Sequence, residues 1–193
     1  LGGNGRAIIV AKNTYLRTAT KCIVKWVDFQ GASSEKTFEI KDYVTGNYTR
    51  MPIEGLPEGD YDFYIYNVDD WGNKSLTVEC HGSSYGKEYA RIQPKIAVTA
   101  ITVDDSNTAQ ITMSTSKMAV KFRLTYQGDN AEEKTLDVNG TGGKLMIPNW
   151  GDYENLQLKV TTYILPKDKL GVDTLVLQEV TQTAKQTVID FDV

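Results

Sequence analysis

The segment from Ile53 to Val78 constrains the fold of this chain more than any other stretch. It reads IEGLPEGDYDFYIYNVDDWGNKSLTV. Tyr61, Phe63 and Ile65 recur at every second position, and side chains spaced by two lie on one face of a β-strand. A Leu-Pro-Glu-Gly turn precedes this run, and an Asp-Asp-Trp-Gly-Asn turn follows it. The segment therefore predicts a turn, a strand, a hairpin loop and a return strand, which together form half of a β-sandwich.

Similar segments recur about every ten residues along the whole chain, with turn sequences between them. Residues 1–5 read as a Gly-rich lead-in, and residues 140–143 read as a hairpin turn. No segment shows sustained helical spacing of apolar residues; residues 83–92 are the best helix candidate, weakened by their Tyr and Gly. The pattern predicts an all-β protein of immunoglobulin-like or fibronectin type III-like β-sandwiches. The clearest alternation places one set of side chains on a single face: Met118, Val120, Phe122, Leu124 and Tyr126.

The two halves of the chain resemble each other, which predicts a duplicated domain. We expect two tandem sandwiches, residues 1–93 and residues 94–193, with Pro94 at the connector. The matching segments are Lys21–Trp26 with Lys117–Phe122, Glu35–Phe38 with Glu133–Leu136, and Ile53–Tyr61 with Ile147–Tyr153.

The repeat fails at one place. Leu156, Leu158 and Val160 are out of step with Tyr153, whereas Tyr61 is in step with the strand that follows it. A shift of one residue turns every side chain to the other face. Either a bulge intervenes in the second half, or Tyr153 lies in the turn.

The charge of the chain argues against two classes of partner. It has 21 Lys and Arg against 25 Asp and Glu, a net charge of −4 and a pI of about 5.1. Nucleic acid and anionic membranes both need a concentrated basic patch, and the sequence has no basic run. No apolar stretch is long enough to span a membrane. The chain begins with Leu-Gly-Gly rather than Met, so we expect a processed product whose targeting segment has been removed.

Two cysteines, Cys22 and Cys80, leave two alternatives open. They either form a disulfide between strands, or are two thiols buried as small apolar side chains. His81 is the only histidine, which removes the usual sites with two or three histidine ligands. Ser83 and Ser84 follow it, but neither lies in a G-x-S-x-G motif. We expect His81 to be a surface residue at the end of a strand.

Paired carboxylates could serve a glycosidase, but the candidates all fall in predicted turns or at strand starts. These candidates are Asp69, Asp70, Asp104, Asp105, Glu132 and Glu133. The Asp-Asp-x-Gly-Asn turn lacks the spaced oxygen ligands and terminal Glu of a calcium loop. We therefore predict no catalytic residue, no metal, no cofactor and no enzymatic activity.

Aromatic residues are the remaining functional signal. If Tyr61, Phe63 and Ile65 point into the core, Tyr64 and Tyr66 point outward. Trp71 lies at a predicted hairpin tip, and Trp150 lies in a predicted turn, where exposure is also expected. An exposed aromatic surface stacks on sugar rings or anchors a protein; the alternative is that aromatics merely suit strand surfaces.

Within this set we predict that Trp71, Tyr64 and Tyr66 contact a ligand. Three further aromatic residues, Tyr61, Trp26 and Phe122, are predicted to be structural.

The opening segment resembles a known domain. Leu56-Pro57-x-Gly59-x-Tyr61-x-Phe63-x-Ile65, followed by Asp69-x-x-Gly72-Asn73-x-Ser75, resembles the E–F turn and F–G hairpin of fibronectin type III domains. The resemblance implies that the Tyr61 hydroxyl bonds back to the preceding backbone as a tyrosine corner.

A narrower resemblance covers residues 1 to about 95. Gly5-Arg6, the LPEGxYxF and DxxGNxS segments and Gly82-x-x-Tyr85-Gly86 together resemble an uncharacterised domain family of secreted, lipid-anchored surface proteins of Bacteroides-type gut bacteria. This resemblance implies export to the cell envelope, either the outer membrane surface or the periplasm. It also implies membrane association only through a removed N-terminal lipid anchor, and no established activity.

Two functions follow from these observations. The first is a non-catalytic binding or spacer module at the cell surface or in the periplasm, with carbohydrate as the first candidate ligand. The second is a protein–protein adhesion or assembly component of the cell envelope, whose aromatic face or open sheet edge docks another chain.

Overall fold

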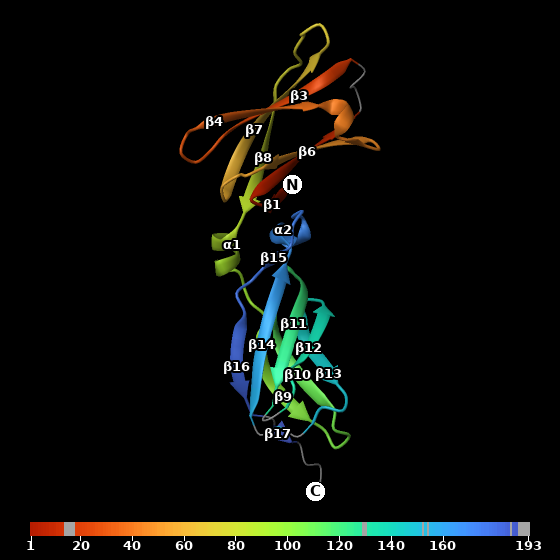
Figure 1. The fold of residues 1–193 in the computed structure, drawn as a ribbon, viewed down its shortest axis with the longest axis vertical. Coiled ribbons are helices and arrows are strands. Elements are labelled where there is room, and N and C mark those ends of the chain that lie inside the picture. The colour runs from red at the N-terminus through yellow and green to blue at the C-terminus, as the bar shows by residue number, and fades with distance from the viewer. Residues whose placement is uncertain (14–17, 129–130, 152, 154, 186, 189–193) are drawn as a thin grey trace. The chain divides into compact units, whose positions relative to one another are not determined.

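Strands account for most of the chain in the computed structural model (Figure 1), which describes residues 1–13, 18–128, 131–151, 153, 155–185 and 187–188. The predicted fold class, tandem fibronectin type III-like β-sandwiches, is confirmed. The chain divides into two units, the first formed by Leu1–Tyr89 with Leu170–Thr174 and the second by Ala90–Lys169 with Leu175–Val193. Among the described residues, no helix is both long enough and apolar enough to cross a membrane.

The described residues of the first unit form eight strands and a short 3-10 helix, η1 (Ile40–Asp42). The strands are hydrogen-bonded in the order β4-β3-β7-β8-β1-β2-β6-β5. They are β1 (Gly2–Asn4), β2 (Arg6–Lys12), β3 (Ala19–Val27), β4 (Ser33–Glu39), β5 (Val44–Thr45), β6 (Tyr48–Glu54), β7 (Gly59–Asp69) and β8 (Val78–Tyr85). The helix α1 (Lys87–Ile92) begins within the segment predicted as the best helix candidate.

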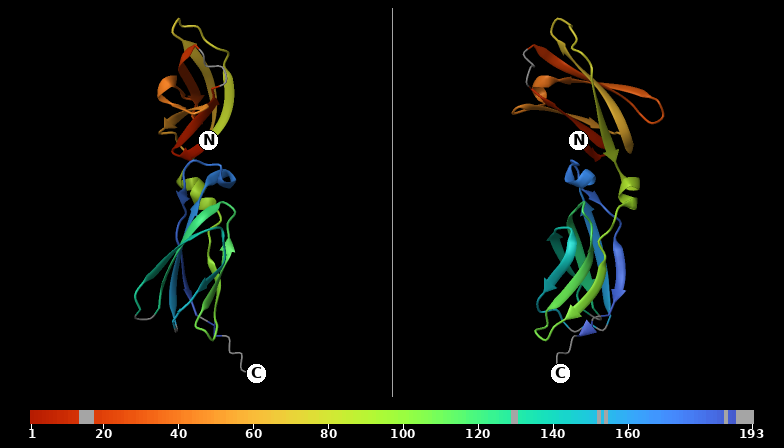
Figure 2. Two further views of the ribbon diagram at one scale, coloured as in Figure 1. Left: turned by 90° about the vertical axis from the view of Figure 1, so that its right-hand side faces the viewer. Right: turned by 180° about the vertical axis from the view of Figure 1, so that it is seen from behind.

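This row of strands folds over on itself to make two layers, as Figure 2 shows. Ala7, Ile9 and Met51 from β2 and β6 share one buried cluster with Phe38 and Phe63 from β4 and β7. Residues at every second position of each strand therefore face a common core, as the alternation predicted. The layer of β2 and β6 packs in this way on the layer of β3, β4, β7 and β8.

The short strand β1 joins the two layers. It pairs antiparallel with β2 and parallel with β8. A Cβ atom on Gly2 would lie 2.5 Å from the Ser83 carbonyl oxygen and 2.5 Å from the Tyr85 ring. The glycines of the predicted lead-in are therefore required for close strand packing rather than for flexibility.

The residue predicted as a tyrosine corner makes the expected hydrogen bond. Tyr61 is buried at the start of β7, and its hydroxyl donates to the Pro57 carbonyl oxygen at 2.8 Å. The Phe63 and Tyr61 rings stack with centroids 5.9 Å apart. The turn before β7 is thus fixed to the core by both packing and a hydrogen bond.

We predict that Tyr61→Phe lowers the free energy of unfolding of the first unit by about 1 kcal/mol, because it leaves the Pro57 carbonyl without its donor. Urea unfolding followed by circular dichroism measures this change. Tyr64→Phe removes a hydroxyl from the outward face of the same strand and should leave the midpoint unchanged. Equal midpoints for both variants would contradict the structural role of the Tyr61 hydroxyl.

A charged clasp holds β1 in the first unit. Asp173 accepts hydrogen bonds from Arg6 Nε at 2.8 Å and Nη2 at 2.6 Å, and from the Asn4 amide at 2.8 Å. The Val172 amide also donates to the Gly2 carbonyl at 2.8 Å. The hydrogen bonds from Arg6 are the main reason that the pKa of Asp173 lies below its usual value.

We predict that Asp173→Asn destabilises the first unit by about 1–2 kcal/mol at neutral pH. Because the folded pKa is lowered, the contribution of Asp173 is present above its unfolded pKa of about 4 and is lost as pH falls. The difference in stability between wild type and variant should therefore shrink between about pH 5 and pH 2. Thermal unfolding across that range measures it, and a difference independent of pH would refute the ionic clasp.

The second unit repeats the plan of the first. One sheet has the order β13-β10-β9-β17, and the other has β12-β11-β14-β15 with β16 also paired to β14. Its strands are β9 (Val98–Val103), β10 (Ala109–Thr115), β11 (Ala119–Gln127), β12 (Lys134–Asn139), β13 (Gly142–Ile147), β14 (Leu156–Ile164), β15 (Leu175–Val176), β16 (Val180–Ala184) and β17 (Thr187–Val188). A short helix, α2 (Pro166–Lys169), follows β14.

The matching segments occupy matching places in the two units. The Lys21–Trp26 match lies in β3 and β11, each of which pairs with the strand after it. Each also pairs with the strand that follows the turn, β7 or β14. The repeat in the sequence therefore corresponds to a repeat in topology.

Three details of the second unit differ from expectation. Gly140–Gly143 is not a hairpin turn, because it leads from β12, which pairs with β11, to β13, which pairs with β10. A register shift between Ala119 and Lys121 places Ala119 in the core and leaves Met118 and Val120 half-buried. Tyr153 precedes β14 and lies outside any strand. Of the two alternatives, a bulge in the strand or a position in the turn, the structure has the second.

Trp150 is also not exposed. It is among the most buried side chains of the second unit. Its ring stacks on Tyr126 with centroids 4.6 Å apart and meets Tyr153 edge-on at 5.6 Å. The predicted turn residue is therefore part of the core, because its ring packs against Tyr126 and Tyr153.

Candidate functional site

Two predicted contact residues lie together on the outward face of the first unit. Tyr64 and Tyr66 are on β7, which lies between β3 and β8, and the preceding residue Phe63 points into the core. Tyr64 is 36% exposed and lies opposite Lys25 on β3 and Glu79 on β8. The alternation of β7 thus produces an aromatic outer surface directly above the buried aromatic core.

Tyr66 is half-buried and lies beneath two cations. The Lys25 ammonium lies 5.9 Å from the centre of its ring, and the Lys74 ammonium lies 5.5 Å away. Lys25 also forms an ion pair with Glu35 at 2.9 Å. Cation–π contacts hold the ring in place at the surface, so Tyr66 offers a fixed edge and hydroxyl rather than an open face.

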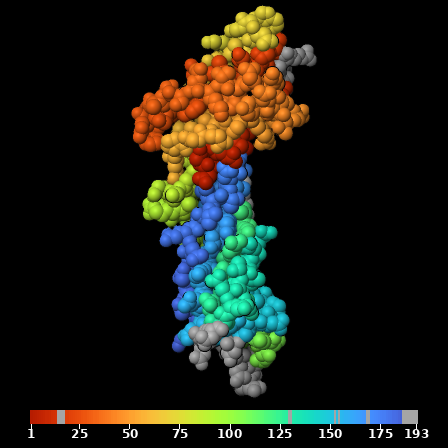
Figure 3. Space-filling model, viewed as in Figure 1, coloured from red at the N-terminus to blue at the C-terminus, as the bar shows by residue number. Residues whose placement is uncertain are grey.

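Trp71 lies at the tip of the loop between β7 and β8 and is 78% exposed. Figure 3 shows this loop, in yellow, projecting from the body of the first unit. Asp69 holds the loop: its carboxylate accepts from the amides of Trp71 at 3.0 Å and Asn73 at 2.8 Å. The hydrogen bond from the Asn73 side-chain amide is the main reason that the pKa of Asp69 is lowered, and the backbone amides lower it further.

The same carboxylate turn occurs at two other hairpins. Asp28 accepts from the amides two and four residues later, at 2.9 and 2.8 Å. Asp104 accepts from the Ser106 and Thr108 amides at 3.0 and 2.9 Å. Asp69 and Asp104, considered above as carboxylate candidates, therefore have their oxygens engaged in turn geometry.

A carboxylate–imidazole cluster adjoins the tyrosines. Asp62 on β7 pairs in register with His81 on β8, and their side chains are in contact. Glu79 completes the group: one ligand atom from each of the three side chains lies within 4.8 Å of the others. All three residues are exposed. Oxygen and imidazole ligands of this kind hydrogen-bond hydroxyl groups and also bind divalent cations.

Sequence reasoning missed this cluster. Asp62 and His81 lie 19 positions apart, and only the register of β7 against β8 brings them together. His81 was expected at the end of a strand, whereas it lies inside β8. The alternation of β7 predicts that Asp62 and Tyr64 face outward. Continuing this alternation across the hairpin to the return strand would have placed outward-facing partners beside them.

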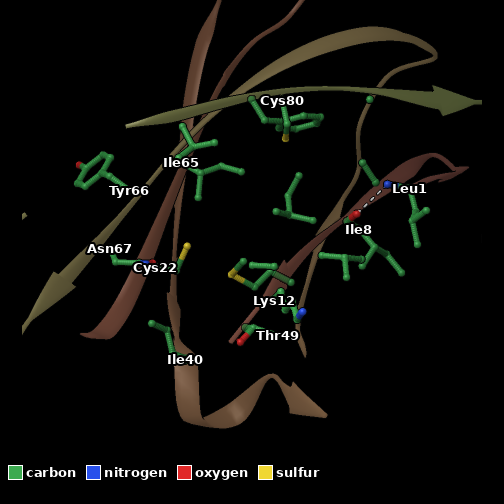
Figure 4. A pocket seen from close by; sticks show the side chains of 18 of the residues that line it. Leu1, Ile8, Lys12, Cys22, Ile40, Thr49, Ile65, Tyr66, Asn67 and Cys80 are labelled. Atoms are coloured by element: carbon green, nitrogen blue, oxygen red, sulfur yellow. Dashed lines mark hydrogen bonds between the residues drawn. The ribbon is translucent and has the colours of Figure 1, made fainter. Parts of the chain in front are cut away.

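A second feature is an apolar cleft between the two layers of the first unit, with a volume of about 500 Å³. Figure 4 shows Leu1 and Ile8 on one wall and Cys22, Ile65 and Cys80 toward the other. Met51 and Phe63 form its buried floor. This cleft was not predicted from the sequence.

The remaining predicted residues have structural positions. Phe122 and Tyr61 are buried, and Trp26 is half-buried against the core of the first unit, 6.4 Å from the Phe63 ring. Trp71 is on the loop, while Tyr64 and Tyr66 are on the sheet face; within the described residues, no ring contact joins Trp71 to either tyrosine. Lys74, from the loop, links the two regions through its contact with Tyr66.

The two cysteines are free thiols that line the cleft. Cys22 is buried, and desolvation raises the pKa of its thiol to about 11. Cys80 is partly exposed, and desolvation also raises its pKa. Of the two alternatives left open by the sequence, the structure has the unpaired thiols.

We predict that iodoacetamide modifies Cys80 before Cys22 in the native protein, with at least tenfold slower reaction at Cys22, because only the thiolate reacts and Cys22 is buried. Mass spectrometry of timed samples measures both rates. In urea without a reductant the two rates should become similar. Failure of both to react under those conditions would indicate a disulfide and contradict the free thiols.

A family model, DUF4998, described as a domain of unknown function, matches residues 1–174. No curated protein matches the sequence.

Several solved structures are similar to this chain at low sequence identity. The FN1–FN3 domains of chicken CNTN1 are 12% identical, with a TM-score of 0.43, covering 95% of this chain and 61% of that one. A bacterial ice-binding adhesin retained at a host cell surface is 15% identical, with a TM-score of 0.43 and coverage of 96% and 58%. The fibronectin(III)-like modules of Clostridium thermocellum CbhA are 14% identical, with a TM-score of 0.41 and coverage of 95% and 88%. This chain thus spans about 60% of the first of these structures.

Proposed function

This chain belongs to the DUF4998 family, described as a domain of unknown function, and we propose that it is a non-catalytic binding module whose outward β3–β7–β8 face contacts carbohydrate. The observation that carries the proposal is the placement of Tyr64 and Tyr66 beside the cluster of Asp62, Glu79 and His81. In this proposal the exposed Tyr64 ring stacks on the apolar face of a sugar. The Tyr66 hydroxyl, the carboxylates and the imidazole bind sugar hydroxyl groups.

The shape of the face determines the kind of carbohydrate. Tyr64 lies on the surface of a sheet, and Tyr66 and His81 lie where this surface borders the cleft between the layers. A surface of this form suits a chain of sugars lying across the strands better than a single enclosed sugar. Trp71, on the loop beyond Tyr66, extends the aromatic surface in the direction of β7.

We also propose that the protein acts outside the cytoplasm, at the cell envelope. The resemblance of residues 1 to about 95 to secreted, lipid-anchored surface proteins supports this location. A role in contacting polysaccharide or another envelope component fits it.

We predict that Tyr64→Ala and Trp71→Ala each weaken binding to a polysaccharide about tenfold, because each removes a stacking surface worth about 1.4 kcal/mol. Both residues are exposed, so the free energy of unfolding should change by less than about 0.5 kcal/mol. A glycan array identifies the ligand, and calorimetry measures each affinity.

Tyr48→Ala is the matched control. Tyr48 is 43% exposed on β6, in the other layer of the sandwich, and its removal should leave the affinity unchanged. The proposal fails if no polysaccharide on the array binds, or if the Tyr48 variant loses as much affinity as the Tyr64 variant.

A further inference from the structure

An imidazole and two carboxylates meet on the outward face of the β7–β8 hairpin. Asp62 lies opposite His81, and Glu79 lies two residues before His81, so the three side chains project from one face of the sheet. One ligand atom from each lies within 4.8 Å of the other two. Among the residues that the structure describes, this is the one place where three side chains able to bind a metal come so close together.

The backbone beneath this group is regular. β7 and β8 pair without a register shift from Gly59 opposite Ser84 to Ile65 opposite Val78. The three side chains therefore start from fixed positions, and only their torsion angles have to adjust to a ligand. In a tetrahedral zinc site, with metal–ligand bonds of about 2.1 Å, the ligand atoms lie about 3.4 Å apart. Closing by at most about 1.4 Å would bring the three groups to that separation.

The charge of the cluster is not balanced by a lysine or arginine. Within the described part of the chain, Asp62 forms its ion pair with His81, and Glu79 forms none. Lys25, which lies on the same face of the neighbouring strand, pairs with Glu35 instead at 2.9 Å. A simple surface ion pair needs only Asp62 and His81. Glu79 adds a second negative charge beside them, which is unfavourable unless a cation balances it.

The second unit lacks these ligands. Tyr163 of β14 corresponds to Tyr64 of β7, because each lies opposite the matching lysine of the preceding strand in its sheet. On the other side, Tyr64 lies opposite Glu79, whereas Tyr163 lies opposite Val176. Two residues before the tyrosine, the second unit has Thr161 in place of the aspartate. The shared plan of the two units therefore does not require the cluster.

We propose that Asp62, Glu79 and His81 bind a zinc ion. Imidazole nitrogen and carboxylate oxygen are both zinc ligands, whereas calcium takes six to eight oxygen ligands and magnesium keeps most of its waters. Three protein ligands leave one position of a tetrahedral ion open. Because all three residues are exposed, this position faces solvent and is accessible to water or to an oxygen of a bound ligand.

The zinc site uses residues of the face that we propose contacts carbohydrate. Binding of the ion itself requires no sugar, and only a contact between the ion and a sugar oxygen would rest on the proposed function. The sequence led us to expect no metal, because a single histidine removes sites with two or three imidazole ligands. The cluster needs only one imidazole, and strand pairing supplies its carboxylates.

Titration of the intact chain with zinc chloride, followed by calorimetry, tests the proposal. The protein carries no histidine tag, and no polysaccharide is present. We expect one zinc ion per chain, bound at least tenfold more tightly than calcium or magnesium. Because His81 is the only histidine, its imidazole gives a single set of NMR signals, which should shift as zinc is added.

Four variants locate the ion. His81→Ala and Glu79→Gln each remove one ligand and should weaken zinc binding at least tenfold, while the thermal unfolding midpoint stays unchanged because both side chains are exposed. Glu39→Gln removes the same charge from an exposed position on β4, where Glu39 pairs with Lys21, and should bind zinc as wild type does. Cys80→Ser removes the partly exposed thiol, the other kind of zinc ligand, and should also bind as wild type does.

Four results would overturn the proposal. These are absence of zinc binding, calcium binding as tight as zinc binding, unshifted His81 signals while zinc binds, and a loss in the Glu39 or Cys80 variant equal to that in the His81 variant. Failure of the zinc titration leaves the carbohydrate proposal standing, because Tyr64→Ala and Trp71→Ala test that proposal with a polysaccharide. Failure of the glycan array likewise leaves the zinc titration unaffected.

Discussion

The register of β7 between β3 and β8 is the constraint on which the rest of the first unit depends. Phe63 lies opposite Trp26 on one side and Cys80 on the other, so three strands present inward side chains at the same level. A slip of one residue would bring Asp62 and Tyr64 into the core and turn Phe63 to solvent. The same register creates the outward surface, because the partners of Asp62 and Tyr64 are His81 and Glu79. Core and candidate site are thus two consequences of one set of backbone hydrogen bonds.

Those features that depend on local sequence could be predicted. The period of two in β7 and β11 follows from residues adjacent in the chain, and so do the turns at Asp69 and Asp104. The tyrosine corner at Tyr61 also lies within a short segment, four residues from its acceptor. The internal repeat also predicts contacts between distant segments, because two copies of one plan share a strand order.

Features that depend on distant neighbours could not be predicted. In the sequence, Gly2 is typical of a flexible lead-in, and only the structure places Ser83 and Tyr85 against it. Trp150 reads as a turn residue until its stack with Tyr126 is known. The bulge near Ala119 changes the phase of a strand whose sequence alternates without interruption. The cluster at His81 and the cleft beside β2 both arise from pairing between segments far apart in the chain, which composition and period do not encode.

The outer faces of the two units differ mainly in their charged groups. On the corresponding face of the second unit, Arg123 and Lys121 bind Asp137 at 2.8 and 3.0 Å and lower its pKa. The same face carries Tyr163, which is half-buried, with the Lys121 ammonium 5.1 Å from the centre of its ring.

The register places Tyr163 of β14 opposite Lys121, just as it places Tyr64 of β7 opposite Lys25. A tyrosine on the outer face therefore occurs in both units and belongs to their shared plan. Exposed aromatic surface adds little to the stability of the unit that carries it. The exposed part of the Tyr64 ring is thus not needed for stability, and contact with a ligand is the explanation that we propose for it.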